Sequence, residues 1–380
     1  MRLLKARLAL PTLLSLACAA ALVGVTSPTT SSTVSAHGGV TEDTLFDWVI
    51  QYSNWGRWGP DDERGTNNFI TPAKRVAASR LVRHGITVPT ARSPFLINFD
   101  PTLPQFPALP SLAPKPTEPR AVDESNPFYV WWNPPGFTSD RWNFAAAGAT
   151  HTHLDAMCHT ALAASTVGRV YPERLHYNGI PLATNNTADG CAKLGIDVVA
   201  DGIFTRGVLL DATLIDEIRE PGYPWVAPGM GVTREMLERL EHLQRVRVRS
   251  GDVLLLYTGR FARRDALGPW PTGCAGGLTP PSCGMVGFDP DTIPFMYERE
   301  VAHIGNDSWN DISPSPFPGF ASLIYHGFQA ALGLTHFDNM DLEKLIQVAR
   351  EQRRYQFLFT TGPFPVEGGA TSIVNPIAIF

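Results

Sequence analysis

Residues 151–155 read His-Thr-His-Leu-Asp, and this segment restricts the possible folds more than any other feature of the chain. In an extended strand, alternate side chains point to the same face. His151, His153 and Asp155 are then expected on one face, and His159 follows four residues later. Two imidazoles and a carboxylate on one face suit Zn²⁺, Mn²⁺ or Fe²⁺. The segment predicts a strand that carries a metal or catalytic site, and a hydrogen-bonded polar cluster is the competing interpretation.

The first 36 residues resemble an export signal. Three basic residues precede an apolar run over 8–25, and small residues at 34–36 suit cleavage before His37. A membrane anchor and lipidation at Cys18 are alternatives. Loss of three basic residues and no acid takes the formal net charge from −5 to −8. We therefore expect a secreted or periplasmic protein with no nucleic-acid partner and no stable membrane association after cleavage.

Four cysteines remain after the export signal, and an even number in an exported chain favours disulfides. Cys274 and Cys283 flank a short loop rich in glycine and proline, which predicts a disulfide between them. Cys158 lies beside His159 and is expected either to pair with Cys191 or to remain a buried thiol. A thiolate nucleophile is disfavoured because no separate activating base is evident.

Helical and strand patterns alternate along the chain, which predicts the α/β class. We expect one domain over 37–380, with a proline-rich surface arm or lid at 100–127. Helices are expected near 44–52, 71–83, 233–245, 291–304 (with a short strand), 323–332 and 341–351. Strands are expected near 86–91, 128–132, 143–156, 202–211, 252–258, 357–361 and 373–379.

The run 152–159 reads Thr-His-Leu-Asp-Ala-Met-Cys-His. It resembles the Thr-His-x-Asp-x-x-x-His pattern of the family of metal-dependent hydrolases called the Putative cyclase family, which includes bacterial kynurenine formamidases and isatin hydrolase. The resemblance covers nearly the whole mature chain and is to the longer members of the family. It implies a swivelling β/β/α layered domain and a homo-oligomer, either a dimer or a tetramer. Further matching segments lie at 54–62, 177–179, 205–211 and 251–256.

The resemblance implies that His153 and Asp155 are metal ligands. Shorter members carry another ligand histidine at the position of Ala149, and we expect His151 to replace it because both positions lie on one strand face. His159 is expected to be either a ligand of a second metal or the general base.

The resemblance also implies that a distal histidine and a glutamate complete a second metal site. His326 matches the histidine, whereas Asp338 stands where the glutamate is expected and is one methylene shorter. His336 is a fallback ligand. The expected cofactor is therefore a divalent metal, Zn or Mn, with one or two ions per chain.

These features predict a hydrolase that uses metal-activated water to cleave a C–N or C–O bond of a cyclic or aryl amide, lactone or ester. Trp55, Trp58 and Trp142 are candidate walls for a small-molecule substrate, although ordinary core packing is the competing interpretation for each. A serine hydrolase is disfavoured because no Gly-x-Ser-x-Gly elbow occurs. An amidohydrolase barrel and a non-catalytic exported binding protein on the same scaffold remain alternatives.

Overall fold

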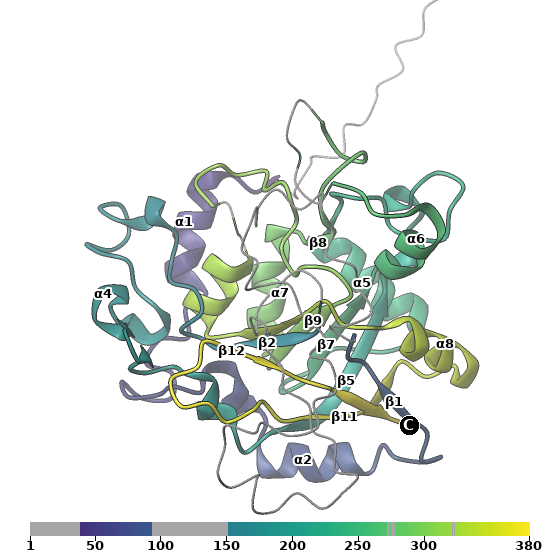
Figure 1. Ribbon diagram of the computed structural model, residues 1–380, viewed down its shortest axis with the longest axis horizontal. Coiled ribbons are helices and arrows are strands. Elements are labelled where there is room, and N and C mark those ends of the chain that lie inside the picture. Colours follow the sequence, from purple (N-terminus) through teal and green to yellow (C-terminus); the bar gives the residue numbers. More distant parts are fainter. Residues whose placement is uncertain (1–38, 93–150, 272–273, 275–277, 321, 323) are drawn as a thin grey trace, which may run out of the picture. The chain divides into compact units, whose positions relative to one another are not determined.

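A nine-stranded sheet organises the part of the chain that the computed structural model describes, which is residues 39–92, 151–271, 274, 278–320, 322 and 324–380 (Figure 1). The predicted signal at 1–36, the proline-rich arm at 100–127 and the strand at 128–132 lie outside these residues. From one edge to the other the order is β1 (Thr87–Pro89), β13 (Ile377–Ile379), β11 (Gln356–Thr361), β5 (Ile203–Asp211), β7 (Val253–Tyr257), β9 (His303–Asn306), β10 (Thr335–Asp338), β2 (His153–Asp155) and β12 (Thr371–Ile373).

The centre of the sheet is parallel, because β5, β7, β9 and β10 all run in one direction. The strands outside this centre pair antiparallel, including β2 with both β10 and β12. The predicted α/β class is confirmed. The barrel alternative is wrong, because the described strands form an open mixed sheet with two edges instead of a closed ring of parallel strands.

The helices begin at capping residues that the sequence makes visible. Thr71 and Thr233 accept hydrogen bonds from backbone N–H groups in the first turns of α2 and α5. Helix α2 ends at Ser79, four residues before the predicted end. The helix expected at 323–332 is a π-helix, η9. The helices are α1 (Glu42–Gln51), α2 (Pro72–Ser79), α4 (Leu182–Asn185), α5 (Arg234–Gln244), α6 (Arg260–Leu267), α7 (Ile293–Glu298), η9 (Ile324–Leu332) and α8 (Glu343–Gln352).

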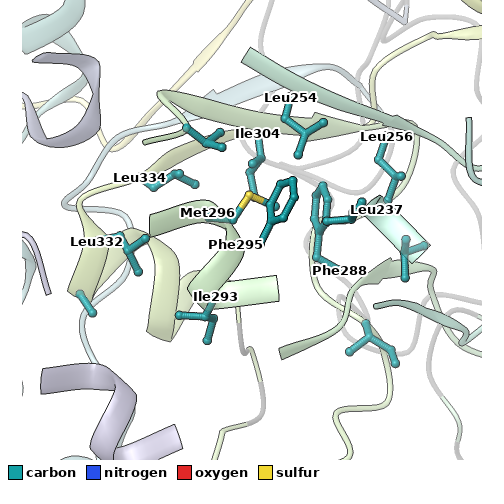
Figure 2. Close-up of a cluster of buried hydrophobic side chains, with 14 of the residues drawn as sticks. Leu237, Leu254, Leu256, Phe288, Ile293, Phe295, Met296, Ile304, Leu332 and Leu334 are labelled. Carbon is teal, nitrogen blue, oxygen red and sulfur yellow. The ribbon is translucent and has the colours of Figure 1, made fainter. Parts of the chain in front are cut away.

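One face of the sheet is covered by helices α5 and α7, whose apolar side chains meet the strands in a buried cluster (Figure 2). Phe295 and Met296 of α7 pack with Leu254 of β7 and Ile304 of β9. Burial of each such side chain contributes about 1.5–3 kcal/mol. Leu243 of α5, by contrast, is 59% exposed.

The opposite face carries a second apolar cluster under α8, because strand side chains alternate between the two faces. Leu255 of β7, Leu154 of β2 and Phe337 of β10 point to this side. His303 of β9 is buried here as well. Its Nε2 donates to Asn67 Oδ1 at 3.1 Å, and its Nδ1 lies 2.7 Å from Thr335 Oγ1.

Two disulfides link the described cysteines. Cys274 and Cys283 are bonded as predicted, with a Cα–Cα distance of 5.3 Å. Cys158 pairs with Cys191 at a Cα–Cα distance of 6.3 Å, which decides between the two expectations for Cys158. Cys191 lies on β4 (Gly190–Cys191), which pairs with β3 (Asn186–Thr187) in a two-stranded sheet. A second two-stranded sheet joins β6 (Gly231–Val232) to β8 (Gly287–Phe288). No helix among the described residues is both long and apolar enough to cross a bilayer.

Candidate metal centre

The antiparallel pairing of β2 with β10 brings four metal-competent side chains onto one face of the sheet. Asp338 is the register partner of His153, and Phe337 is the partner of Leu154. Leu154 and Phe337 point into the apolar cluster under α8. The residues on either side of each along its strand therefore point to the other face of the sheet. His153 and Asp155 of β2 therefore face the same side as His336 and Asp338 of β10. All four are almost fully buried.

Three of these side chains meet at distances that suit a single cation. One ligand atom from each of His153, Asp155 and Asp338 lies within 4.8 Å of the others. His153 Nε2 is 3.6 Å from Asp155 Oδ1 and 3.9 Å from Asp338 Oδ2. The fourth side chain contacts the set, since His336 Nε2 is 3.2 Å from Asp155 Oδ2. The ligand set is thus one histidine and two carboxylates, with a second histidine beside it.

The carboxylate of Asp155 is the clearest sign that this cluster is a cation site. It is 1% exposed, and its oxygens face the imidazole nitrogens of His153, His159 and His336 at 3.2–3.8 Å. A buried carboxylate is costly unless cations or hydrogen-bond donors surround it. Burial raises the pKa of Asp155, but the imidazoles of His159 and His153 outweigh burial and hold this pKa below its usual range. The residues present therefore fit a divalent metal, whose positive charge would offset that of the buried carboxylates.

The orientation of His153 leaves one ring nitrogen directed at the carboxylates. Nδ1 lies 3.0 Å from the backbone oxygen of His151. A carbonyl oxygen can only accept, so Nδ1 is the donor, and Nε2 is the ring nitrogen that faces the carboxylates. A backbone carbonyl in this position is the usual way in which proteins orient a ligand histidine.

Asp338 is held in place from the loop that follows β9. Asn310 donates to Asp338 Oδ1 twice, from its backbone nitrogen at 3.1 Å and from Nδ2 at 2.6 Å. The end of β10 is fixed as well, because Thr152 Oγ1 donates to the backbone oxygen of Asn339 at 2.8 Å. These bonds leave Asp338 Oδ2 facing His153.

His159 is the solvent-facing member of the group. Its side chain is 32% exposed, and Nε2 lies 3.8 Å from Asp155 Oδ2. It follows β2 on a turn in which its backbone nitrogen donates to Ala156 O at 2.9 Å. Two further links secure this turn, the disulfide from Cys158 to Cys191 and a hydrogen bond of 2.7 Å from Gln329 Nε2 to Ala156 O. A titratable group at the solvent edge of a buried carboxylate set is well placed to exchange protons.

Two more of the predicted ligands, His151 and His326, lie outside the three-residue set, as His159 does. The imidazole of His151 precedes β2 and lies 5.7 Å, centroid to centroid, from that of His153, so its role as a ligand stays a prediction. His326 lies on η9, but its side chain is not among those described. Asp338, which we expected to pair with His326 at a second site, lies with His153 and Asp155, and its pairing with His326 stays a prediction.

The described tryptophans are anchored by other parts of the chain. Trp55 Nε1 donates to Ala330 O at 2.8 Å, and its ring stacks on Tyr171 with centroids 5.0 Å apart. Trp58 meets Phe69 edge-on with centroids 5.0 Å apart. Trp142 lies outside the described residues. A substrate role for these three tryptophans stays a prediction.

Sequence reasoning missed Asn310 and Gln329. The segment 307–311 is entirely polar apart from one tryptophan and directly follows the buried strand β9. Polar residues at the carboxyl end of a parallel strand commonly belong to a site, and this signal was available for Asn310. Gln329 lies in an apolar helix, and no pattern in the sequence marks it.

A family model described as "Putative cyclase" matches residues 96–310, which is more than half of the chain. The chain belongs to the Putative cyclase family. The match includes His153, Asp155, His159 and Asn310, whereas His336 and Asp338 follow it. A search of curated proteins gives no match to this cyclase-family chain.

Solved structures share the fold of this cyclase-family chain. A crystal structure of "a novel cyclase" is 28% identical, covers 86% of this chain and 99% of its own, and superposes with a TM-score of 0.64. The layered fold implied by the family resemblance is thereby confirmed. A structure of isatin hydrolase A from Labrenzia aggregata bound to benzyl benzoate is 16% identical, covers 81% of this chain and 98% of its own, and has a TM-score of 0.50.

Proposed function

We propose that this chain is an exported metal-dependent hydrolase that cleaves a C–N or C–O bond of a cyclic or aryl amide, lactone or ester. The observation that carries the proposal is the buried set of His153, Asp155 and Asp338, whose ligand atoms lie within 4.8 Å of one another. Family membership supports it, and one protein with this fold is named an isatin hydrolase. The two disulfides support an oxidising compartment and hence export.

The chain would hold a divalent metal, Zn²⁺ or Mn²⁺, through His153, Asp155 and Asp338. His336 is beside Asp155 and is available as a further ligand or as a donor to it. Burial lowers the pKa of His336, but the carboxylates of Asp155 and Asp338 outweigh burial and raise it. When bound, such a metal supplies Lewis-acid activation of water and of a carbonyl group.

His159 is the group that we assign to proton transfer. Its partial exposure gives it access to water and substrate, and Asp155 is 3.8 Å from its Nε2. In the neutral form Nε2 accepts a proton from water as the carbonyl is attacked. The resulting imidazolium then returns the proton to the leaving nitrogen or oxygen. The adjacent carboxylate stabilises the imidazolium between these two transfers.

The decisive experiment combines metal analysis with hydrolysis of formanilide and of a simple aryl lactone. The purified protein is expected to retain Zn²⁺ or Mn²⁺, and Asp155→Asn is expected to lose both the metal and the activity. Asp211→Asn is the matched control, because Asp211 is a buried aspartate at the end of β5 that pairs with Arg350. A wild-type protein without metal, or an Asp155→Asn variant that hydrolyses as fast as the wild type, would refute the proposal and favour a non-catalytic binding protein.

We also propose that the protein forms a dimer or tetramer. Light scattering of the purified mature chain measures this directly, and a monomer at micromolar concentration would contradict it.

A further inference from the structure

Both sequence neighbours of His159 are tied to other parts of the chain. Cys158, directly before it, is buried and bonded through its sulfur to Cys191 of β4. Thr160, directly after it, has its backbone oxygen 3.1 Å from Nδ1 of His176. A carbonyl oxygen can only accept, so Nδ1 of His176 donates this bond. The backbone on either side of His159 is therefore fixed by one covalent link and one hydrogen bond.

The two links lead to the same place, which is the hairpin of β3 and β4. The ring of His176 is fully buried, and its second nitrogen, Nε2, lies 3.3 Å from Oδ1 of Asn186 on β3. Asn186 and Cys191 are register partners in the pairing of β3 with β4. One cross-strand pair thus reaches both neighbours of His159, through the disulfide on one side and through His176 on the other.

The hairpin is itself anchored to the edge of the large sheet. Cys191 N donates to Gly368 O at 2.8 Å. Gly190 has a φ of +118°, and a Cβ there would lie 2.6 Å from Gly368 O, so the two backbones are in close contact. Gly368 shortly precedes β12, whose Thr371 is the register partner of Asp155. The hairpin is therefore fixed against the strand that pairs with the one carrying Asp155.

We propose that the β3–β4 hairpin, acting through the Cys158–Cys191 disulfide and His176, positions His159 for proton transfer. The residues of this link are positioning residues, since they act through His159. The inference rests on the proposed function, because it assigns them an effect on hydrolysis. A displacement of about 1 Å in a reacting group can lower a rate about 100-fold, so fixing the turn on both sides of His159 matters for turnover.

The proposal separates turnover from metal binding. The ligands His153, Asp155 and Asp338 lie on β2 and β10, and those strands are held by their own pairing with each other and with β12. Loss of the disulfide is therefore expected to displace His159 and to leave the metal ligands in place.

The test is the hydrolysis of the aryl lactone by the full chain with Cys158→Ser/Cys191→Ser. The expected result is a kcat about tenfold lower or less, with KM and metal content within about twofold of the wild type. Cys274→Ser/Cys283→Ser is the matched control, because it removes the other disulfide. It is expected to keep the wild-type kcat.

A double-mutant cycle with His159→Ala distinguishes positioning from a general structural effect. If the disulfide acts through His159, its removal in the His159→Ala background changes kcat by less than about twofold. An equal loss of kcat in both backgrounds would overturn the proposal, as would a wild-type kcat in the folded double cysteine variant.

Asn186→Ala provides a second variant in case the double cysteine variant does not fold. Asn186 is exposed, so its truncation is expected to preserve the melting temperature while kcat falls several-fold through loss of the contact with His176. A wild-type kcat in Asn186→Ala would show that the hairpin does not act on His159 by this path, and would overturn the part assigned to His176.

The position of His159 is also measured without turnover, by NMR of protein with labelled histidines. His159→Ala identifies the imidazole signal of His159, and this signal is expected to shift or broaden in Cys158→Ser/Cys191→Ser but not in Cys274→Ser/Cys283→Ser. An unchanged signal in the first variant would refute the proposal. If the wild-type protein hydrolyses no substrate, the proposed function fails, and the NMR result alone decides whether the hairpin holds His159 in position.

Discussion

The side chain of Asn310 supports the metal centre through one acidic ligand, and its removal should weaken metal binding by a definite amount. Nδ2 donates to Asp338 Oδ1 at 2.6 Å and to Phe337 O at 2.8 Å, and the residue is fully buried. Asn310→Ala removes both bonds but keeps the backbone bond to Asp338 Oδ1 at 3.1 Å. A hydrogen bond to a charged group contributes about 1.5–3 kcal/mol. The metal dissociation constant is therefore expected to rise about 10- to 100-fold.

The measurement is a competition between the protein and a chelating dye for Zn²⁺ and Mn²⁺ near neutral pH. Unfolding in urea is followed in parallel, because Phe337 O also loses a partner and some loss of stability is expected. Asn185→Ala is the matched control. Asn185 is a buried asparagine at the end of α4, and its amide exchanges two hydrogen bonds with the backbone of Lys193.

The control should lose stability without a change in metal affinity. If folded Asn310→Ala protein binds metal within about twofold of the wild type, Asp338 does not ligate the metal or does not depend on Asn310 for its position. Such a result would refute the reasoning that Asn310 supports the metal centre through Asp338.

Two further predictions concern stability. Burial lowers the pKa of His303 to about 3, so between that value and the unfolded value of about 6.5 only the unfolded chain takes up a proton. Stability therefore falls as the pH falls, by about 2 kcal/mol at pH 5 relative to pH 7. The difference in unfolding free energy between the wild type and His303→Gln should therefore be about 2 kcal/mol smaller at pH 5 than at pH 7. An equal difference at the two pH values, measured by urea titration, would contradict this prediction. The double Cys158→Ser/Cys191→Ser variant should lose about 4 kcal/mol of unfolding free energy for a separation of 33 residues, against about 2.5 kcal/mol for Cys274→Ser/Cys283→Ser with a separation of 9. Equal losses in urea under oxidising conditions would show that loop length does not determine the difference.

The central strands of the fold were predictable because their local composition favours an extended conformation. Residues 203–211 and 253–257 are rich in β-branched or leucine side chains and are buried on both faces, as strands in a parallel sheet must be. The segment with the metal ligands was also predictable as a strand, because His153 and Asp155 are two residues apart and alternate residues of a strand share one face. The end of α2 was not, because the helix stops at Ser79 without a glycine or proline to mark the place.

The composition of the metal centre was only partly accessible to sequence reasoning. His153 and Asp155 are two residues apart, and a local pattern contains both. The third member, Asp338, joins them through the pairing of two strands that are far apart in the chain, and a single sequence does not contain the register of that pairing. Asn310 depends on the same long-range arrangement, because its role exists only where Asp338 is already placed.

The pairing of β2 with β10 also makes the metal centre a product of late assembly. Its ligands come from two short strands near one edge of the sheet, and no local segment of the chain contains them all. The entropy of closing such a long loop must be overcome before any cation finds its full set of donors. Bound metal would then favour only chains in which this edge has closed, and would stabilise them by mass action. The metal content of a preparation would thus report the fraction of molecules whose sheet is complete, independently of any turnover.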